Sequence, residues 1–77
     1  MPEKREEALK RARKEGFPES NVVQATEGEH KDMWFIAPKG IKDDKVKLVY
    51  ANLRSNSMDA EEAAKIAWSI QNKIDNA

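Results

Sequence analysis

The chain contains no cysteine, only three glycines and three prolines in 77 residues, and an aromatic content of 6%. Without cysteine neither a disulfide nor a thiolate metal site can form, so a reducing, cytoplasmic location is the natural expectation. The glycines are scattered, which excludes a glycine-rich phosphate loop. The longest apolar run, residues 33–38, is too short to span a bilayer, and residues 3–7 are all charged, so we expect neither a membrane span nor a secretory leader.

The chain also lacks an excess of either charge, because 14 Lys and Arg side chains balance 14 Asp and Glu side chains. This balance argues against a surface built as a whole to hold nucleic acid or an anionic membrane. A chain of this length is close to the size at which one core barely offsets chain entropy. We therefore expect one small soluble domain over residues 1–77, frayed at 1–3 and 75–77.

The clearest pattern is an amphipathic helix over residues 58–77. Asp59, followed three residues later by Glu62, has the spacing of a capping box. Trp68 falls on one flank of the apolar face and Ile66 on the other, so the apolar arc is wide. Such a helix packs against two elements at once or keeps part of its surface for a partner. The face itself is formed by residues at helical spacing: Ala60, Ala63, Ala67, Ile70 and Ile74.

The first part of the chain predicts a helix and a hairpin. Residues 3–15 are rich in strong helix formers, Gly16 stands where a C-terminal cap belongs, and Pro18 prevents continuation. Residues 22–26 and 33–37 read as two strands separated by a polar stretch with one glycine, which is most simply a β-hairpin.

Residues 43–55 fit either a helix, with Asp43 or Asp44 as N-cap, or an alternating strand. We favour the helix. The predicted fold is thus a small α+β domain of order α-β-β-α-α, with a β-hairpin packed against helices. The alternative is α-β-β-β-α, with a three-stranded meander. The predicted core consists of Val22 or Val23, Trp34 or Phe35, Ile36, Val46, Val49, Leu53, Ile66, Ile70 and Ile74.

No motif predicts catalysis, a cofactor or a metal, and we expect a protein that is not an enzyme. The only histidine, His30, has no marked nucleophile or orienting carboxylate. Glu27, Glu29 and Asp32 surround it at the hairpin tip, but their spacing does not match a calcium-binding loop. A charged, solvated turn explains these four residues at least as well.

One short segment resembles a known family. Residues 63–68 are similar to the C-terminal helix of the bacterial ChaB family, small regulators of cation transport, at Ala63, Lys65, Ala67 and Trp68. The resemblance covers fewer than ten residues and transfers no function to this chain.

Binding to a protein partner is the expected function. As a short, highly charged chain without cysteine, this protein is similar to accessory proteins of bacteria and their phages. Trp68 could form an aromatic anchor together with whichever of Trp34 and Phe35 faces outward, because tryptophan and tyrosine are enriched at interface hot spots. The small side chains of the last helix, Ala64 among them, permit close helix approach within the chain or across a dimer.

Nucleic-acid binding is the alternative. Lys10, Arg11, Arg13 and Lys14 are close together on the first predicted helix, and Trp34 and Phe35 could stack on bases. Because strand neighbours point to opposite faces, only one of the two aromatics could be core in a two-layer fold.

Overall fold

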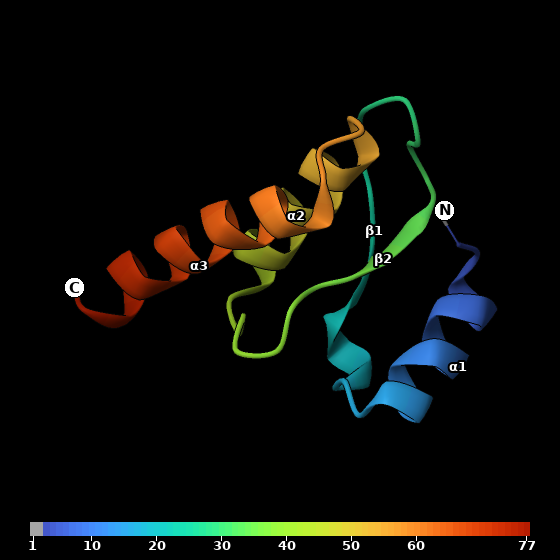
Figure 1. Ribbon diagram of the computed structural model, residues 1–77, viewed down its shortest axis with the longest axis horizontal. Coiled ribbons are helices and arrows are strands. Elements are labelled where there is room, and N and C mark those ends of the chain that lie inside the picture. Colours follow the sequence, from blue (N-terminus) through green and yellow to red (C-terminus); the bar gives the residue numbers. More distant parts are fainter. Residues whose placement is uncertain (1–2) are drawn as a thin grey trace.

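The computed structural model describes residues 3–77 (Figure 1). The predicted α+β class and the order α-β-β-α-α are confirmed, and residues 43–55 form the helix that was favoured and not a third strand. The elements in chain order are α1 (Arg5–Glu15), a short 3-10 helix η1 (Glu19–Asn21), β1 (Val22–Gln24), β2 (Trp34–Ile36), α2 (Asp44–Ser55) and α3 (Ala60–Asp75).

The helix ends follow from local chemistry. The Asp43 carboxylate accepts hydrogen bonds from the backbone N–H groups of Lys45 and Val46 and so caps α2, and Asp59 accepts from Glu61 at the start of α3. Gly16 ends α1 in the left-handed conformation, with φ of +78°. The predicted cap positions Asp43, Asp59 and Gly16 are therefore confirmed, but Asp59 bonds to the N–H of Glu61 and not to that of Glu62, as the capping-box spacing had indicated.

The two strands are antiparallel and pair Val23 with Phe35, but each is shorter than predicted. Beyond β1, the backbone N–H of Thr26 donates to the side chain of Asn52 at 2.8 Å. The Ser55 hydroxyl likewise donates to the Glu27 carbonyl at 2.7 Å. The hairpin loop is thus hydrogen-bonded to the C-terminal part of α2. These bonds take the place of strand-to-strand bonds that a longer β1 would form.

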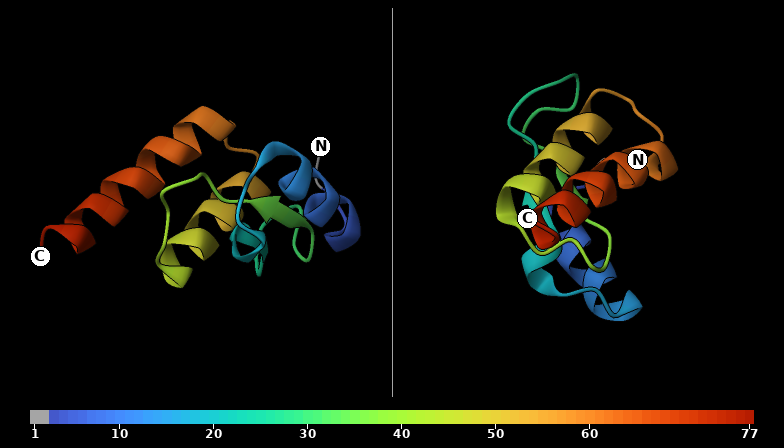
Figure 2. Two further views of the ribbon diagram at one scale, coloured as in Figure 1. Left: turned by 90° about the horizontal axis from the view of Figure 1, so that it is seen from below. Right: turned by 90° about the vertical axis from the view of Figure 1, so that its left-hand side faces the viewer.

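Both faces of the hairpin are covered (Figure 2). On one face Val22 and Ile36 pack against α1, and on the other Phe35 packs with α2 and α3. Phe35 is therefore the aromatic that faces the main core. Trp34 is half-buried beside the α1 cluster, with the Arg5 guanidinium 5.6 Å from its ring centroid.

The core differs from the prediction mainly in α3. Val22, Phe35, Ile36 and Val46 are buried as predicted, and Val23, Val49, Leu53 and Ile70 are partly buried. Ile66 and Ile74 are exposed, so their assignment to the core was wrong. The stripe that faces α2 is instead Ala63, Ala67 and Gln71, and the last turns of α3 extend beyond the rest of the molecule (Figure 1). Buried residues that the prediction omitted include Ala25, Ala37, Ile41, Tyr50 and Ala51.

The chain ends were expected to be frayed at residues 1–3 and 75–77. Residues 1 and 2 lie outside the described residues, while Glu3 forms an antiparallel bridge with Trp34 and α3 extends to Asp75. Across residues 3–77, none of the helices combines the length and the apolar content needed to cross a membrane.

Candidate functional site

A groove of about 850 Å³ lies between α1 and α3, and we call it the α1–α3 groove. The two helices stand on either side of β2 and of the loop that follows it (Figure 2, left). β1 contributes no lining residue, so the groove lies on the side of β2 that faces away from its partner strand. Its apolar lining comes from five segments of the chain: Phe17, Ile36, Pro38, Tyr50, and Ala60, Ala64 and Trp68 of α3.

Trp68 is the most exposed of the groove's large apolar residues, at 44%. Its indole N–H donates to the backbone carbonyl of Lys39 at 3.4 Å, which holds the ring over the loop after β2. Ile66, exposed at 38%, lies on the opposite flank of α3, because two residues span more than half a helical turn. The wide apolar arc is thus divided between a groove wall and a solvent-facing side.

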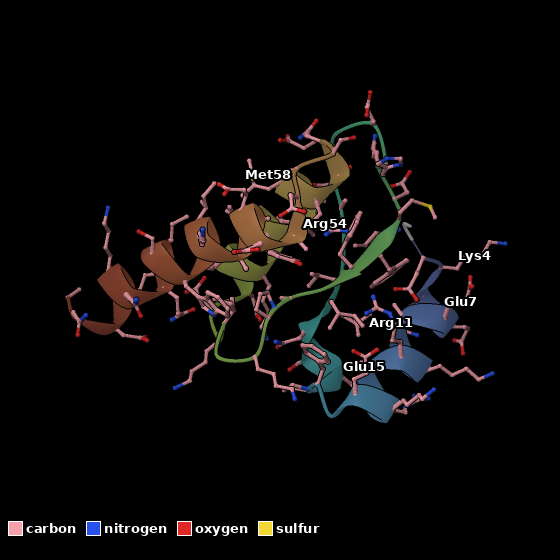
Figure 3. All side chains as sticks on the ribbon, in the orientation of Figure 1. Lys4, Glu7, Arg11, Glu15, Arg54 and Met58 are labelled. Atoms are coloured by element: carbon pink, nitrogen blue, oxygen red, sulfur yellow. The ribbon has the colours of Figure 1, made fainter. Side chains whose placement is uncertain are left out.

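The charged side chains that line the groove differ in the partners that they have within the chain. Arg11 is hydrogen-bonded to Glu3, and this bond raises the pKa of its guanidinium. Lys39 donates to the backbone carbonyl of Glu15 at 3.2 Å. Arg54 has no carboxylate partner among residues 3–77, and its Nε is shielded from solvent without a hydrogen bond. Figure 3 shows Arg11 and Arg54 on opposite sides of β2. Among residues 3–77, Arg54 and Lys39 both lack a carboxylate partner, but only Arg54 has a buried nitrogen without a hydrogen bond.

Burial raises the pKa of the Tyr50 hydroxyl above its ordinary value of 10.0, and the positive charges of Arg54 and Arg11 partly oppose this effect. The folded state thus holds the neutral phenol more strongly than the unfolded state does. Below pH 10 both states are protonated and the pH has no effect through this group. As the pH rises above about 10, the unfolded chain releases the proton first, and stability falls.

This linkage gives a test on Tyr50→Phe. Between about pH 9 and pH 11 the wild type should lose more unfolding free energy than the variant does. Urea unfolding at both pH values measures the difference. Because the chain has one tyrosine, tyrosinate absorbance reports on Tyr50 alone. Equal titration midpoints in the folded and the urea-unfolded protein would show that burial does not hold the phenol neutral.

The other predicted protein-binding residues are less available than Trp68. Phe35 and Ala64 are buried, and Trp34 is half-buried. Trp34 packs against the α1 cluster and does not line the groove that Trp68 lines, so the predicted anchor of Trp68 with the outward-facing aromatic does not form in this groove. Ala64 lines the groove with Trp68 one turn further along α3.

The predicted nucleic-acid residues Lys10, Arg11, Arg13 and Lys14 are all exposed on α1. Arg11 pairs with Glu3 and Glu15, and Arg13 pairs with Glu19 at 3.2 Å. Phe35 lies under α2 on the far face of the hairpin, so the structure does not place these cations and both aromatics on one surface.

The hairpin-tip carboxylates also remain separate. Glu29 accepts a hydrogen bond from the Ser57 hydroxyl at 2.8 Å, and within residues 3–77 no group of three His, Asp or Glu side chains is placed to hold a metal ion.

Sequence reasoning missed Phe17, Tyr50 and Arg54 as site residues. Tyr50 and Arg54 are four residues apart in the predicted helix over residues 43–55, so they lie on the same side of it. This spacing is the feature of the sequence that could have placed them in one site. Phe17 follows the cap glycine and has no periodic neighbours. Comparison with models of protein families, with curated proteins and with solved structures finds no match to this chain.

Proposed function

We propose that this protein is a non-catalytic, cytoplasmic binding protein that holds a segment of a partner protein in the α1–α3 groove. The observation that carries the proposal is the position of Trp68, which forms a wall of the groove and leaves 44% of its surface exposed. Tryptophan, tyrosine and arginine are the residues most enriched at interface hot spots, and Trp68, Tyr50 and Arg54 meet in this groove.

The electrostatics of the groove favour a partner with a carboxylate. Arg54 stacks over Phe35, 5.8 Å from the ring centroid, and has no carboxylate partner within the described part of the chain. A partly desolvated guanidinium costs free energy until an anion pairs with it, so an acidic side chain gains more here than at an exposed lysine.

The chemistry of the lining supports binding over catalysis. Among residues 3–77 the groove lining contains no histidine, serine or threonine, and its carboxylates, Glu3 and Glu61, are paired with Arg11 and Lys65. Burial raises the pKa of its hydroxyl group, that of Tyr50, which disfavours the phenolate that would act as a nucleophile. A concave apolar surface with a few convergent polar groups is instead what ligand recognition requires.

The experiment is a selection of linear peptides of about twelve residues, displayed at random on phage, against the immobilised full chain. Affinities of the selected peptides are then measured for the wild type, Trp68→Ala and Ile66→Ala. We expect Trp68→Ala to weaken binding about 30-fold, the value of a hot-spot tryptophan, and Ile66→Ala to change it by less than about twofold.

Ile66→Ala is the matched control because both side chains are large, apolar and similarly exposed on the same helix. Circular dichroism of each variant confirms that the fold is kept. Failure to select any binder, or equal losses in the two variants, would contradict the proposal.

A further inference from the structure

Beside the stripe that packs on α2, helix α3 carries a second stripe, formed by Ile66, Ile70 and Ile74 and called here the isoleucine stripe. These residues follow one another at four-residue spacing, so they lie on one side of the helix. Ile66 is 38% exposed and Ile74 46%, while Ile70 is partly buried against the main core. A contiguous exposed apolar stripe, in contrast to a single exposed residue, marks an interaction surface.

The isoleucine stripe is separate from the α1–α3 groove. Trp68 projects from the other side of α3, because two residues span more than half a helical turn. α1 and the C-terminal half of α3 also lie at opposite ends of the molecule (Figure 2, left). The stripe is therefore a second surface, and its occupant does not follow from the proposed function.

Two charged side chains lie along one edge of the isoleucine stripe, near its two ends. Glu62 and Lys73 are separated by about three helical turns, so both project to the same edge. Glu62 lies 4.0 Å from Lys65, which is also 3.8 Å from Glu61, so one cation serves two carboxylates. Lys73 is exposed and has no ion-pair partner among residues 3–77. The edge thus carries an incompletely compensated negative charge at one end and a positive charge at the other.

We infer that the isoleucine stripe binds the same stripe of a second copy of this chain, with the two α3 helices antiparallel. A two-fold axis perpendicular to the helices brings the same edge of each helix together and reverses their direction. Glu62 of each copy then faces Lys73 of the other, and Ile66 lies opposite Ile70. A parallel pair would bring opposite edges together, so the two charges would not meet. The charge pattern is therefore complementary to itself in the antiparallel arrangement.

The size of the contact predicts weak association. α3 has 16 residues, so it is about 24 Å long and about 10 Å wide, and a single helix pair buries less than the roughly 800 Å² per copy of a stable interface. We expect a dissociation constant on the order of 100 µM. At low micromolar concentration the chain is then monomeric, and Ile66→Ala remains a valid control for peptide binding.

Sedimentation equilibrium of the full chain between about 10 µM and about 1 mM tests the pairing, and the wild type should pass from mainly monomer to mainly dimer. Glu62→Lys and Lys73→Glu should each weaken association about tenfold, because each variant places like charges opposite one another at both ends of the contact. An equimolar mixture of these two variants should recover the association of the wild type. In the mixed pair, opposite charges face each other again at both ends.

Glu61→Lys is the matched control, because Glu61 shares Lys65 with Glu62 but lines the groove on the other side of α3. It should change association by less than about twofold, whereas Ile74→Ala, at an exposed position, should weaken it about fivefold. Circular dichroism of each variant confirms that the fold is kept.

Three results would overturn the antiparallel pair. They are a wild type that stays monomeric at about 1 mM, equal losses in Glu62→Lys and Glu61→Lys, and a mixture of the two charge-reversal variants that stays monomeric. None of these results bears on peptide binding in the groove, so the proposed function is tested separately.

Discussion

Replacement of Ile41 by alanine is expected to lower the free energy of unfolding by about 3 kcal/mol, the middle of the range for truncating a buried isoleucine. Ile41 is only 2% exposed and is among the largest fully buried side chains. It packs into the main core with Phe35, Val46 and Tyr50. Truncation removes apolar contacts within this cluster and leaves a cavity.

The same substitution at Ile66 provides the control, since it deletes the same atoms from a side chain that is 38% exposed. We expect Ile66→Ala to cost less than about 1 kcal/mol. Urea unfolding followed by tryptophan fluorescence measures both variants. For a domain of this size, about 3 kcal/mol is a large share of the total stability, so Ile41→Ala should be partly unfolded near body temperature. Similar losses at the two positions would show that Ile41 is not a core residue.

Replacement of Gly28 by alanine should be the second most damaging change, at about 2–4 kcal/mol. The φ of Gly28 is +98°, which a side chain disfavours. An added Cβ would also lie 2.6 Å from the Ser55 hydroxyl oxygen. That hydroxyl cannot move away cheaply, because it is fully buried, donates to Glu27 and accepts from the backbone N–H of His30.

The variant Gly40→Ala separates the cost of a side chain at positive φ from the cost of the close contact with Ser55. Gly40 has nearly the same φ, +94°, but an added Cβ would meet nothing closer than the indole nitrogen of Trp68 at 3.9 Å. It should therefore show only the backbone cost of about 1–2 kcal/mol. Chemical denaturation gives the difference between the two variants, and faster amide exchange at His30 in Gly28→Ala would locate the damage in the loop. Equal losses of unfolding free energy in the two variants would mean that the close contact with Ser55 does not destabilise Gly28→Ala.

These two pairs of variants also show where sequence reasoning succeeded and where it did not. Ile41 stands between Gly40 and Lys42 in a loop, so no helical or strand periodicity marks it as core. Ile66 fits the periodicity of its helix well, yet it is exposed. Periodicity assigns a face to a helix, but the width of the buried part depends on the neighbours that cover it.

The site was predictable only in part. Trp68 was identified because it lies on the flank of a wide predicted apolar face. Arg54 was not identified, because an arginine near the end of a helix is ordinary. Its significance comes from its buried Nε without a hydrogen bond and from the lack of an ion-pair partner among residues 3–77, and both are properties of the folded arrangement.

The sequence by itself determined α1, α3, the hairpin and the caps, because Asp43, Asp59 and Gly16 act on backbone groups within a few residues of themselves. For residues 43–55 it favoured a helix over a strand without deciding between them. Only the tertiary structure decided that α1 and α2 cover opposite faces of the hairpin. The same packing brings Phe17, Tyr50 and Trp68 to one groove along the edge of β2. The physical reason is that capping and turn energies are local, whereas burial depends on which distant segments meet.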